Sequence, residues 1–289
     1  KNISKKIDLY YQVETLIFGK AIQRATTPER IIIGKTNKDS NLNLYYKNYL
    51  NLFKCPKIFM NYESAELAKI AINIMLISSI TSSNVLSNIA SNVNGDWNDI
   101  TKAIKLDKRI GKYSYLRPSL GLSGGNLERD LVSIKKISLK NNVNSNLFDS
   151  FLLNSQSQKN WILLLLKKLN INLEYKICFL GLTYKENTHS IKNSNAIHSI
   201  LKLKRFKINA YDPVINSLDI SKNLSVKHNL FEAVKGCEVL IITTPWSEFF
   251  NLKIKYLNNS DIKILIDPYG VLYDQKNNMK FKYFTIGFD

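Results

Sequence analysis

The sequence predicts an α/β protein in which an all-helical middle precedes a doubly wound parallel sheet. Between residues 61 and 170, apolar residues recur at three- and four-residue spacing, which is typical of helices. After residue 172, short apolar runs alternate with helical stretches, and this alternation predicts parallel strands joined by helices. The length of 289 residues and the 45% of hydrophobic residues predict a globular chain with two or more packing units.

The first strand is expected at residues 29–34, and the residues before it look like the end of a unit whose start is missing. A helix of about thirty residues is expected at 64–93, longer than most helices of globular proteins. Glu63 and Glu66 place negative charge in its first turn, where the helix dipole favours it. Such a long helix commonly forms a scaffold or a subunit interface. Further helical patterns cover residues 98–106, 127–141 and 145–170.

Four apolar runs in the last third predict the strands of the parallel sheet, at residues 175–182, 206–213, 237–244 and 262–267. Helical stretches separate them near residues 194–204, 229–236 and 246–256. Ligands of such sheets bind beyond the carboxyl ends of the strands. Only Gly181 follows the first of these strands, so the dinucleotide fingerprint GxGxxG is not in this part of the chain.

The net charge of +18 raises the question of nucleic-acid binding. The lysines, however, are spread along the chain together with abundant asparagine and isoleucine, a bias that AT-rich coding alone produces. No basic run is interleaved with aromatic residues. We therefore expect no nucleic-acid partner, and a positive field that favours an anionic small molecule.

Cysteine and histidine usage argues against a disulfide framework and a metal site. Cys178 and Cys237 lie in apolar runs, where inert buried thiols are expected, and together with the distant Cys55 they fit a reducing cytoplasm. His189, His198 and His228 have no metal-ligand spacing, so no metal is expected. No unbroken apolar run of membrane-spanning length and no secretory leader is present, so no membrane association is expected.

The stretch "RPSLGLSGGNLERD", residues 117–130, is built like an active-site loop. Its glycines allow a backbone to pass close to a ligand before a helix begins. Around it, several motifs occur in one order: "AELAKIAIN", "DKRIG", "LGLTYKENTHSIKNS", "AYDP", "TTPWSEF" and "LID". In order and approximate spacing the chain resembles the UDP-glucose/GDP-mannose dehydrogenase family.

The resemblance implies three domains and an activity. In that family an amino-terminal NAD-binding Rossmann domain, a helical dimerising middle and a carboxy-terminal nucleotide-sugar-binding domain oxidise C6 of a nucleotide sugar twice, with NAD as the cofactor. The corresponding expectation here is the end of a Rossmann domain at 1–36, a helical dimerisation domain at 37–172, and a Rossmann-like domain at 173–289. A cytoplasmic homodimer and a nucleotide-sugar substrate are implied.

The opening segment "VETLIFGKAI" resembles a stretch late in the family's NAD domain. The GxGxxG half is therefore expected upstream of residue 1, and the chain by itself is not expected to bind NAD well. Glu14 matches a glutamate that contacts the substrate. Phe18 stands where a second glutamate, thought to help water attack a thioester, is found in the family.

The family's glycine-loop pattern, PGxGxGGSCFPKD, places the nucleophilic cysteine four residues before an aspartate. Counting back from Asp130 gives Asn126, and no cysteine is nearby. A thiolate forms the thiohemiacetal and thioester of the second oxidation, and an asparagine amide nitrogen is not nucleophilic enough to replace it. The resemblance therefore predicts an altered acid-forming step.

The first oxidation uses residues that this chain retains. Lys69 and Asn73 match a lysine and an asparagine of the family and lie four residues apart, on one face of the long helix. With Asp130 they are expected to hold a water or alkoxide, and the cation would stabilise oxyanion charge. The alternative is that Lys69 is a solvated charge and Asn73 a packing amide.

The resemblance also implies substrate and cofactor contacts. Arg109 matches an arginine that reaches the neighbouring subunit's substrate, and Lys185 matches a substrate lysine. Arg129 and Lys192 are implied near the cofactor. The loop residues expected to wrap the nucleotide are Tyr115, Leu116, Arg117, Ser119, Gly121 and Gly124. Positions that depart from the family are Leu122, Ser123, His189, Ser190, Lys192 and Tyr269, and the last two replace arginines whose bidentate contacts they do not reproduce.

Three functions follow as hypotheses. The first is a nucleotide-sugar dehydrogenase altered at its nucleophile, of the class that supplies surface-polysaccharide synthesis. The second is a non-catalytic homologue that keeps the dimer scaffold and a nucleotide pocket. The third is an oxidoreductase that stops after one hydride transfer.

Overall fold

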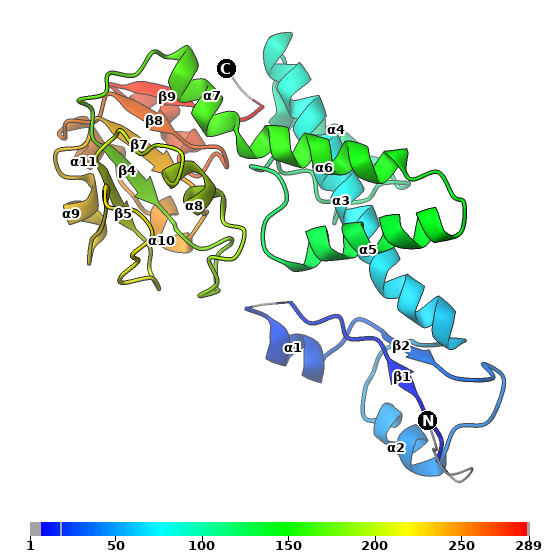
Figure 1. Ribbon diagram of the computed structural model, residues 1–289. Helices are drawn as coiled ribbons and strands as arrows, with labels where there is room; N and C mark the ends of the chain where they lie inside the picture. The colour runs from blue at the N-terminus through cyan, green and yellow to red at the C-terminus, as the bar shows by residue number, and fades with distance from the viewer. Residues whose placement is uncertain (1–6, 18, 288–289) are drawn as a thin grey trace. The chain divides into compact units, whose positions relative to one another are not determined.

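The computed structural model describes residues 7–17 and 19–287 of the chain. It divides into two compact units, Lys1–Met75 and Leu76–Asp289, which are described separately (Figure 1). The three-domain division at residues 36 and 172 stays a prediction. The predicted fold class is confirmed, because a helical region precedes a parallel sheet in the second unit.

The first unit is a small sheet with helices packed against it. The strand expected at 29–34 is β2 (Ile31–Gly34), which runs parallel to β3 (Lys57–Met60) and antiparallel to β1 (Tyr11–Gln12). Alternate side chains of β2 enter opposite cores, as strand geometry requires: Ile32 packs with Val13, and its two neighbours pack with other apolar residues. The helices of this unit are α1 (Ala21–Thr26), α2 (Leu44–Asn51) and the start of α3.

The long helix expected at 64–93 is α3 (Tyr62–Asn92), which begins in the first unit and continues into the second. By length and composition alone, α3 is long and apolar enough to cross a membrane. This corrects the expectation that no segment of the chain reaches membrane-spanning length. Core helices of soluble proteins pass the same test, so the result is weak evidence. Only 22% of its apolar window is buried within the chain. Met75, Ile89 and Val93 therefore belong to an exposed apolar surface.

The helical part of the second unit packs around the carboxyl half of α3. Its helices are α4 (Trp97–Leu106), α5 (Asn126–Lys140), α6 (Asn146–Lys159) and α7 (Trp161–Lys168). The helical pattern expected at 145–170 is present and is divided between α6 and α7. The chain breaks at Asn160, which ends α6 and caps α7, and its Oδ1 accepts a hydrogen bond from Lys202 Nζ at 3.0 Å.

The α/β part of the second unit is a six-stranded parallel sheet in the order β6-β5-β4-β7-β8-β9. The four expected strands are β4 (Ile177–Leu180), β5 (Ile208–Tyr211), β7 (Val239–Ile242) and β8 (Ile264–Ile266). The short strands β6 (Leu224–Val226) and β9 (Lys282–Phe284) were not expected. The connecting helices are α8 (Asn195–Ile200), α9 (Leu230–Val234), α10 (Ser247–Phe250), α11 (Ile254–Asn258) and the 3₁₀ helix η1 (Tyr273–Asn278).

Both faces of this sheet are covered, as a doubly wound fold requires. Ile177 and Phe179 of β4 pack toward α7 and α8, whereas Cys178 and Leu180 pack toward α9, α10 and α11. All three cysteines are free thiols. Among residues 7–17 and 19–287, no group of three metal-ligating side chains could hold a metal ion.

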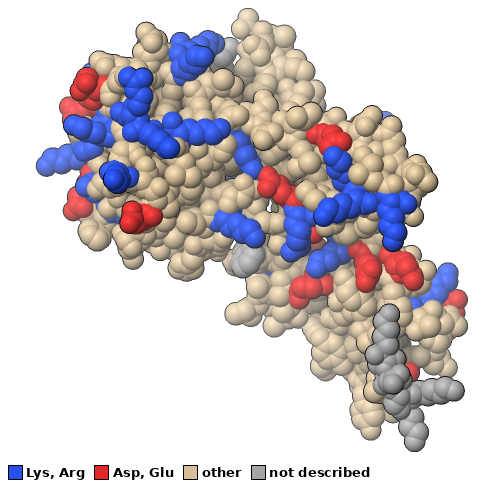
Figure 2. Space-filling view, viewed as in Figure 1, with Lys and Arg blue, Asp and Glu red and all other residues tan. Residues whose placement is uncertain are grey.

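Backbone turns outside the helices and strands use asparagine as well as glycine. The described residues with positive φ that are not glycine are all asparagines: Asn94, Asn142, Asn170, Asn187 and Asn193. Asparagine tolerates this left-handed conformation better than other residues with a side chain. On the face shown in Figure 2, lysine and arginine side chains are spread over the helical and α/β parts, with acidic side chains among them.

Candidate functional site

The glycine loop, residues 117–125, contains two positions that only glycine fits. Gly121 has φ +85°, and a Cβ there would lie 2.5 Å from the carbonyl oxygen of Ser155. Gly124 has φ +75°, and its Cβ would lie 2.7 Å from the ring of Tyr184. Close approach of the loop to α6 and to the loop after β4 therefore depends on these two glycines.

The glycine loop lies against the loop that follows β4, residues 181–194. Ser123 Oγ donates to the carbonyl oxygen of Tyr184 at 3.2 Å, and Asn193 Nδ2 donates to that of Gly124 at 3.1 Å. The Lys192 amine lies 3.2 Å from the place where a Gly125 side chain would begin. Two segments about sixty residues apart thus form one surface in the second unit.

Asn126, which the family resemblance predicts to stand at the nucleophile position, is the exposed first residue of α5. Helix N-termini carry partial positive charge, and the Lys192 side chain lies beside the preceding residue. Asp130 follows one turn later and is 6% exposed, with its Oδ1 accepting from Arg129 Nε at 3.0 Å. The local field therefore favours an anion at position 126, although the side chain there is a neutral amide.

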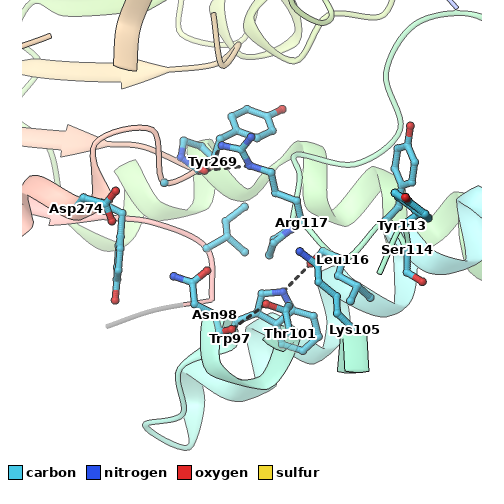
Figure 3. A pocket seen from close by; sticks show the side chains of 16 residues that line it. Trp97, Asn98, Thr101, Lys105, Tyr113, Ser114, Leu116, Arg117, Tyr269 and Asp274 are labelled. Atoms are coloured by element: carbon cyan, nitrogen blue, oxygen red, sulfur yellow. Dashed lines mark hydrogen bonds between the residues drawn. The ribbon is translucent and has the colours of Figure 1, made fainter. Parts of the chain in front are cut away.

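A cavity of about 530 Å³ lies on the α4 side of the glycine loop (Figure 3). Tyr115, Leu116 and Arg117 of the predicted nucleotide-wrapping loop line it, whereas Ser119, Gly121 and Gly124 do not. In Figure 3, Arg117 and Tyr269 lie across the cavity from α4. The other lining residues are Trp97, Asn98, Thr101, Lys105, Tyr113, Ser114, Pro118, Pro268, Gly270, Tyr273, Asp274 and Ile286.

Arg117 connects the glycine loop to the loop between β8 and η1. Its Nε and Nη2 both donate to the carbonyl oxygen of Tyr269, at 3.2 and 2.5 Å. The guanidinium carbon also lies 5.8 Å from the centre of the Tyr269 ring, within the range of a cation–π contact. This pairing fixes a cation at the wall of the cavity.

Lys185 lies on the loop after β4 and does not line the cavity. Its amine is 5.8 Å from the centre of the Tyr184 ring. Burial lowers the pKa of Lys185, and the nearby Glu186 carboxylate opposes that shift. A partly desolvated ammonium of this kind gains from an anionic ligand more than a solvated one does.

Arg109 is exposed in the second unit and forms a bidentate pair with Asp107, at 2.6 and 3.0 Å. The Arg109 guanidinium holds the pKa of the Asp107 carboxyl below its usual range. Arg109 lies outside the cavity lining, and its reach to a neighbouring subunit stays a prediction.

The remaining predicted residues belong to the first unit. Glu14 Oε1 accepts from the amide of Leu16 at 2.6 Å, and Glu14 lines a cavity of about 220 Å³. Lys69 and Asn73 lie half-buried on α3, four residues apart as expected. Their grouping with Asp130 stays a prediction, and Phe18 lies outside the described residues.

Sequence reasoning missed the side of the cavity formed by α4 and η1. Trp97, Lys105, Tyr273 and Asp274 fall outside every motif that the sequence analysis used. A tryptophan near the start of an otherwise polar amphipathic helix was the available signal, because a buried tryptophan needs a partner for its N–H. Trp97 Nε1 indeed donates to the carbonyl oxygen of Leu116 at 2.8 Å.

The second unit combines a helical region and a doubly wound sheet, with the glycine loop lying against the loop after β4. Residues 63–155 match the central-domain model of the UDP-glucose/GDP-mannose dehydrogenase family, and residues 178–275 match its UDP-binding-domain model. The chain belongs to the UDP-glucose/GDP-mannose dehydrogenase family.

Relatives and solved structures agree with this family. The chain is 30% identical over 291 residues to a UDP-glucose 6-dehydrogenase of Rickettsia bellii, covering 95% of this chain and 65% of the relative. A UDP-glucose 6-dehydrogenase of Caenorhabditis elegans is 24% identical over 316 residues, covering 99% of this chain and 65% of the relative. The chain thus spans 65% of the length of these curated relatives.

The fold is shared with solved dehydrogenases of low sequence identity. A UDP-glucose dehydrogenase from Pyrobaculum islandicum superposes with a TM-score of 0.83 at 21% identity, covering 98% of this chain and 64% of that one. A UDP-D-ManNAc dehydrogenase from Pyrococcus horikoshii gives a TM-score of 0.78 at 21% identity, with coverages of 96% and 64%.

Proposed function

We propose that the chain binds a UDP-sugar at the surface formed by the glycine loop, the loop after β4 and the cavity beside Arg117. The observation that carries this proposal is the contact of the two loops, which joins the segment that carries Lys185 and Lys192 to the glycine loop. The cavity volume falls within the range of about 300–1,000 Å³ that is usual for small-molecule sites. The UDP-glucose 6-dehydrogenase relatives favour a UDP-sugar over other nucleotide sugars.

The chemistry of the site suits a nucleoside diphosphate. The cations Arg117 and Lys185 would attract the diphosphate, and the net charge of +18 would favour its approach. The exposed ring of Tyr115 at the cavity offers a face on which a pyrimidine base could stack. A homodimer built on α3 and a cytoplasmic location belong to the same proposal, which the free cysteines and the exposed apolar side chains of α3 support.

NAD is the cofactor of the proposed enzyme, as the family implies. Arg129, in the first turn of α5, and Lys192, on the loop after β4, are the described residues proposed to contact it. The carboxyl end of the six-stranded sheet does not fit a dinucleotide, because Thr244 fills the space beside Gly181. The proposed NAD site therefore does not lie at this sheet. In the proposed reaction NAD would accept the hydride. Lys69 and Asn73 of the first unit, and Asp130 of the second, stay predictions for contacts to the substrate oxygen.

We further propose that any oxidation stops before thioester formation. Asn126 occupies the nucleophile position with an amide whose nitrogen lone pair is delocalised, so it does not attack an aldehyde as a thiolate does. Cys178 and Cys237 are buried beside the sheet, and Cys55 lies in the first unit. Asn126 therefore favours the second candidate function, a nucleotide-sugar-binding homologue that forms no acid.

Calorimetry with UDP and UDP-glucose tests the binding proposal. Lys185→Ala is expected to weaken UDP affinity about tenfold, because it removes a charge-assisted contact to phosphate. Lys222→Ala, which removes an exposed lysine before β6, serves as the matched control and should leave the affinity unchanged. Absence of UDP binding by the unaltered chain, or equal effects of the two substitutions, would contradict the proposal.

A second experiment tests the nucleophile position without requiring turnover. In a Cys55→Ser background, Asn126→Cys places a thiol at the N-terminus of α5, and Asn141→Cys places one at the C-cap of the same helix. The helix dipole and Lys192 should hold the pKa of the first thiol below its usual value of about 8.5. The alkylation rate increases as pH rises through the thiol pKa. This increase should occur at a lower pH for the thiol at position 126 than for the thiol at position 141. Equal profiles would show that this site does not activate a thiolate.

A further inference from the structure

The backbone of residues 115–122 is held by buried side chains from helices far away in the sequence. Ser83 Oγ of α3 donates to the carbonyl oxygen of Tyr115 at 3.1 Å. Trp97 Nε1 of α4 donates to the next carbonyl oxygen, that of Leu116, at 2.8 Å. Ser83 and Trp97 are 1% and 2% exposed, so both bonds are shielded from water.

Two further side chains hold the amide groups of the same segment. Asn84 Oδ1, on α3, accepts from the amide of Ser119 at 2.7 Å, and its Nδ2 lies 3.5 Å from Ser119 Oγ. Ser155 Oγ, on α6, accepts from the amide of Leu122 at 2.9 Å. Asn84 is 1% exposed and Ser155 is 4% exposed. A loop has no strand or helix partner for such amides, so each depends on its one side chain.

These bonds act on the side chains that face the cavity. Arg117 and Tyr115 lie just before Ser119, and Gly121 lies between the two anchored amides. Gly121 also packs on the Ser155 carbonyl oxygen, so the turn at this glycine has no room to shift toward α6. A substitution that removes the acceptor of Asn84 or Ser155 would therefore change the position of the loop backbone.

We propose that Asn84 and Ser155 are positioning residues for the nucleotide: through the amides of Ser119 and Leu122 they hold the loop in the conformation that presents Arg117 and Tyr115 to the cavity. The inference rests on the proposed UDP-sugar binding. It adds two residues that contact no ligand and act through the loop backbone. Pre-formed loops of this kind lower the ordering cost of binding.

The first test needs no ligand. Amide hydrogen exchange is measured in the unaltered chain and in Asn84→Leu and Ser155→Ala, and read at Ser119 and Leu122. Each substitution should speed exchange at its own amide about tenfold or more, since a buried hydrogen bond is lost. Exchange within β4 should stay the same. Unchanged exchange at Ser119 and Leu122 in folded variants would overturn the inference.

The second test separates positioning from general stability. Asn84→Leu keeps the branching and the number of heavy atoms of the side chain but has no acceptor, whereas Asn84→Asp keeps an oxygen for the Ser119 amide. UDP affinity measured by calorimetry should fall about tenfold for the leucine variant and remain closer to that of the unaltered chain for the aspartate variant. Equal affinities for these two variants would overturn the inference.

The control is Ser199→Ala on α8, which removes a fully buried hydroxyl whose oxygen lacks a hydrogen-bond partner. It should change neither loop exchange nor UDP affinity. Where Asn84→Leu does not fold, as judged by circular dichroism, Ser155→Ala carries both tests. Failure of the unaltered chain to bind UDP would reject the proposed function, whereas normal UDP binding by folded Ser155→Ala would reject the positioning role alone.

Discussion

Two places in the second unit could bind a nucleotide: the carboxyl ends of the sheet strands and the cavity beside Arg117. The first is filled by side chains of the chain itself, whereas the second is open. Doubly wound sheets bind ligands at the carboxyl ends of their strands, where the strand order reverses. In this sheet that point lies between β4 and β7. There a Cβ on Gly181 would lie 2.5 Å from Thr244 Cβ, and Thr244 Oγ1 donates to the carbonyl oxygen of Thr183 at 2.7 Å. The space is filled by the chain.

A carboxylate of the chain also takes the hydrogen-bond donors that a phosphate would use. Asp212 Oδ2 accepts from the amides of Leu182 and Thr183, at 2.6 and 3.1 Å, and from Trp246 Nε1 at 3.2 Å. The cavity beside Arg117, in contrast, is open and lined by cations and aromatic rings. The strand ends of this sheet therefore leave no room for a ligand, whereas the loops beside the sheet form an open cavity.

The largest effect is expected at the filled end of the sheet. Gly181→Ala puts a Cβ into Thr244 at φ +94°, so it should lower the free energy of unfolding by more than about 3 kcal/mol through overpacking and left-handed strain. Gly236→Ala has a similar φ of +68° and nothing within 4 Å, so only the strain of about 1–2 kcal/mol should remain. Chemical denaturation measures both. Equal losses would show that the space beside Gly181 is not filled.

The next effect concerns the open cavity. Arg117→Ala removes the cation that lines the wall and its two bonds to Tyr269, so UDP affinity should fall roughly 10- to 100-fold. Arg205→Ala removes an exposed arginine before β5 and leaves the cavity intact. Calorimetry on both variants is the measurement, and an effect of Arg205 as large as that of Arg117 would place the attraction in the general field instead.

A smaller effect is expected in the pH dependence of UDP binding. Burial lowers the pKa of Lys185, so its charge is lost at lower pH than in an ordinary lysine. A diphosphate favours the charged form, so UDP affinity should fall as pH rises through this lowered pKa, with proton uptake on binding. Lys185→Arg keeps its charge throughout and should flatten the profile. The same slope in that variant would assign the titration to another group.

The smallest change in affinity is expected for Asp212→Asn. The substitution removes a negative charge from the filled end of the sheet while an oxygen remains for the amides of Leu182 and Thr183. If UDP binds at the cavity, its affinity should change less than about twofold, because Asp212 is buried and is not among the residues that line the cavity. A clear gain in affinity would place the nucleotide at the sheet instead.

The sequence predicted the parts of the fold that repeat a pattern. β4, β7 and β8 were found because each is an uninterrupted apolar run buried on both faces, and β5 because its buried run is interrupted only by Asn209. β6 and β9 were missed because they have three residues each, at the edges of the sheet, and include polar or charged side chains. Their strand conformation depends on pairing with β5 and β8. The local sequence pattern does not predict this pairing.

The candidate site was predicted only in part for the same reason. The contact between the glycine loop and the loop after β4 could be anticipated from the motifs on both segments. The bond from Asn84 to Ser119 joins residues 35 positions apart, and neither residue departs from its local pattern. Lys105 likewise lies on the polar side of an ordinary amphipathic helix. Such residues acquire a role only once packing brings their elements together.

The asparagines in left-handed turns can be related to the base composition of the gene. A gene biased toward A and T encodes asparagine readily and glycine rarely, and the chain contains 11 glycines. Asn187 and Asn193 show that a side chain is accepted at such turns in the loop after β4. Gly121, Gly124 and Gly181 are different, since a Cβ there would meet other atoms at less than 3 Å. These three glycines therefore mark places where the backbone comes too close to its neighbours for any side chain, whatever residues the base composition favours.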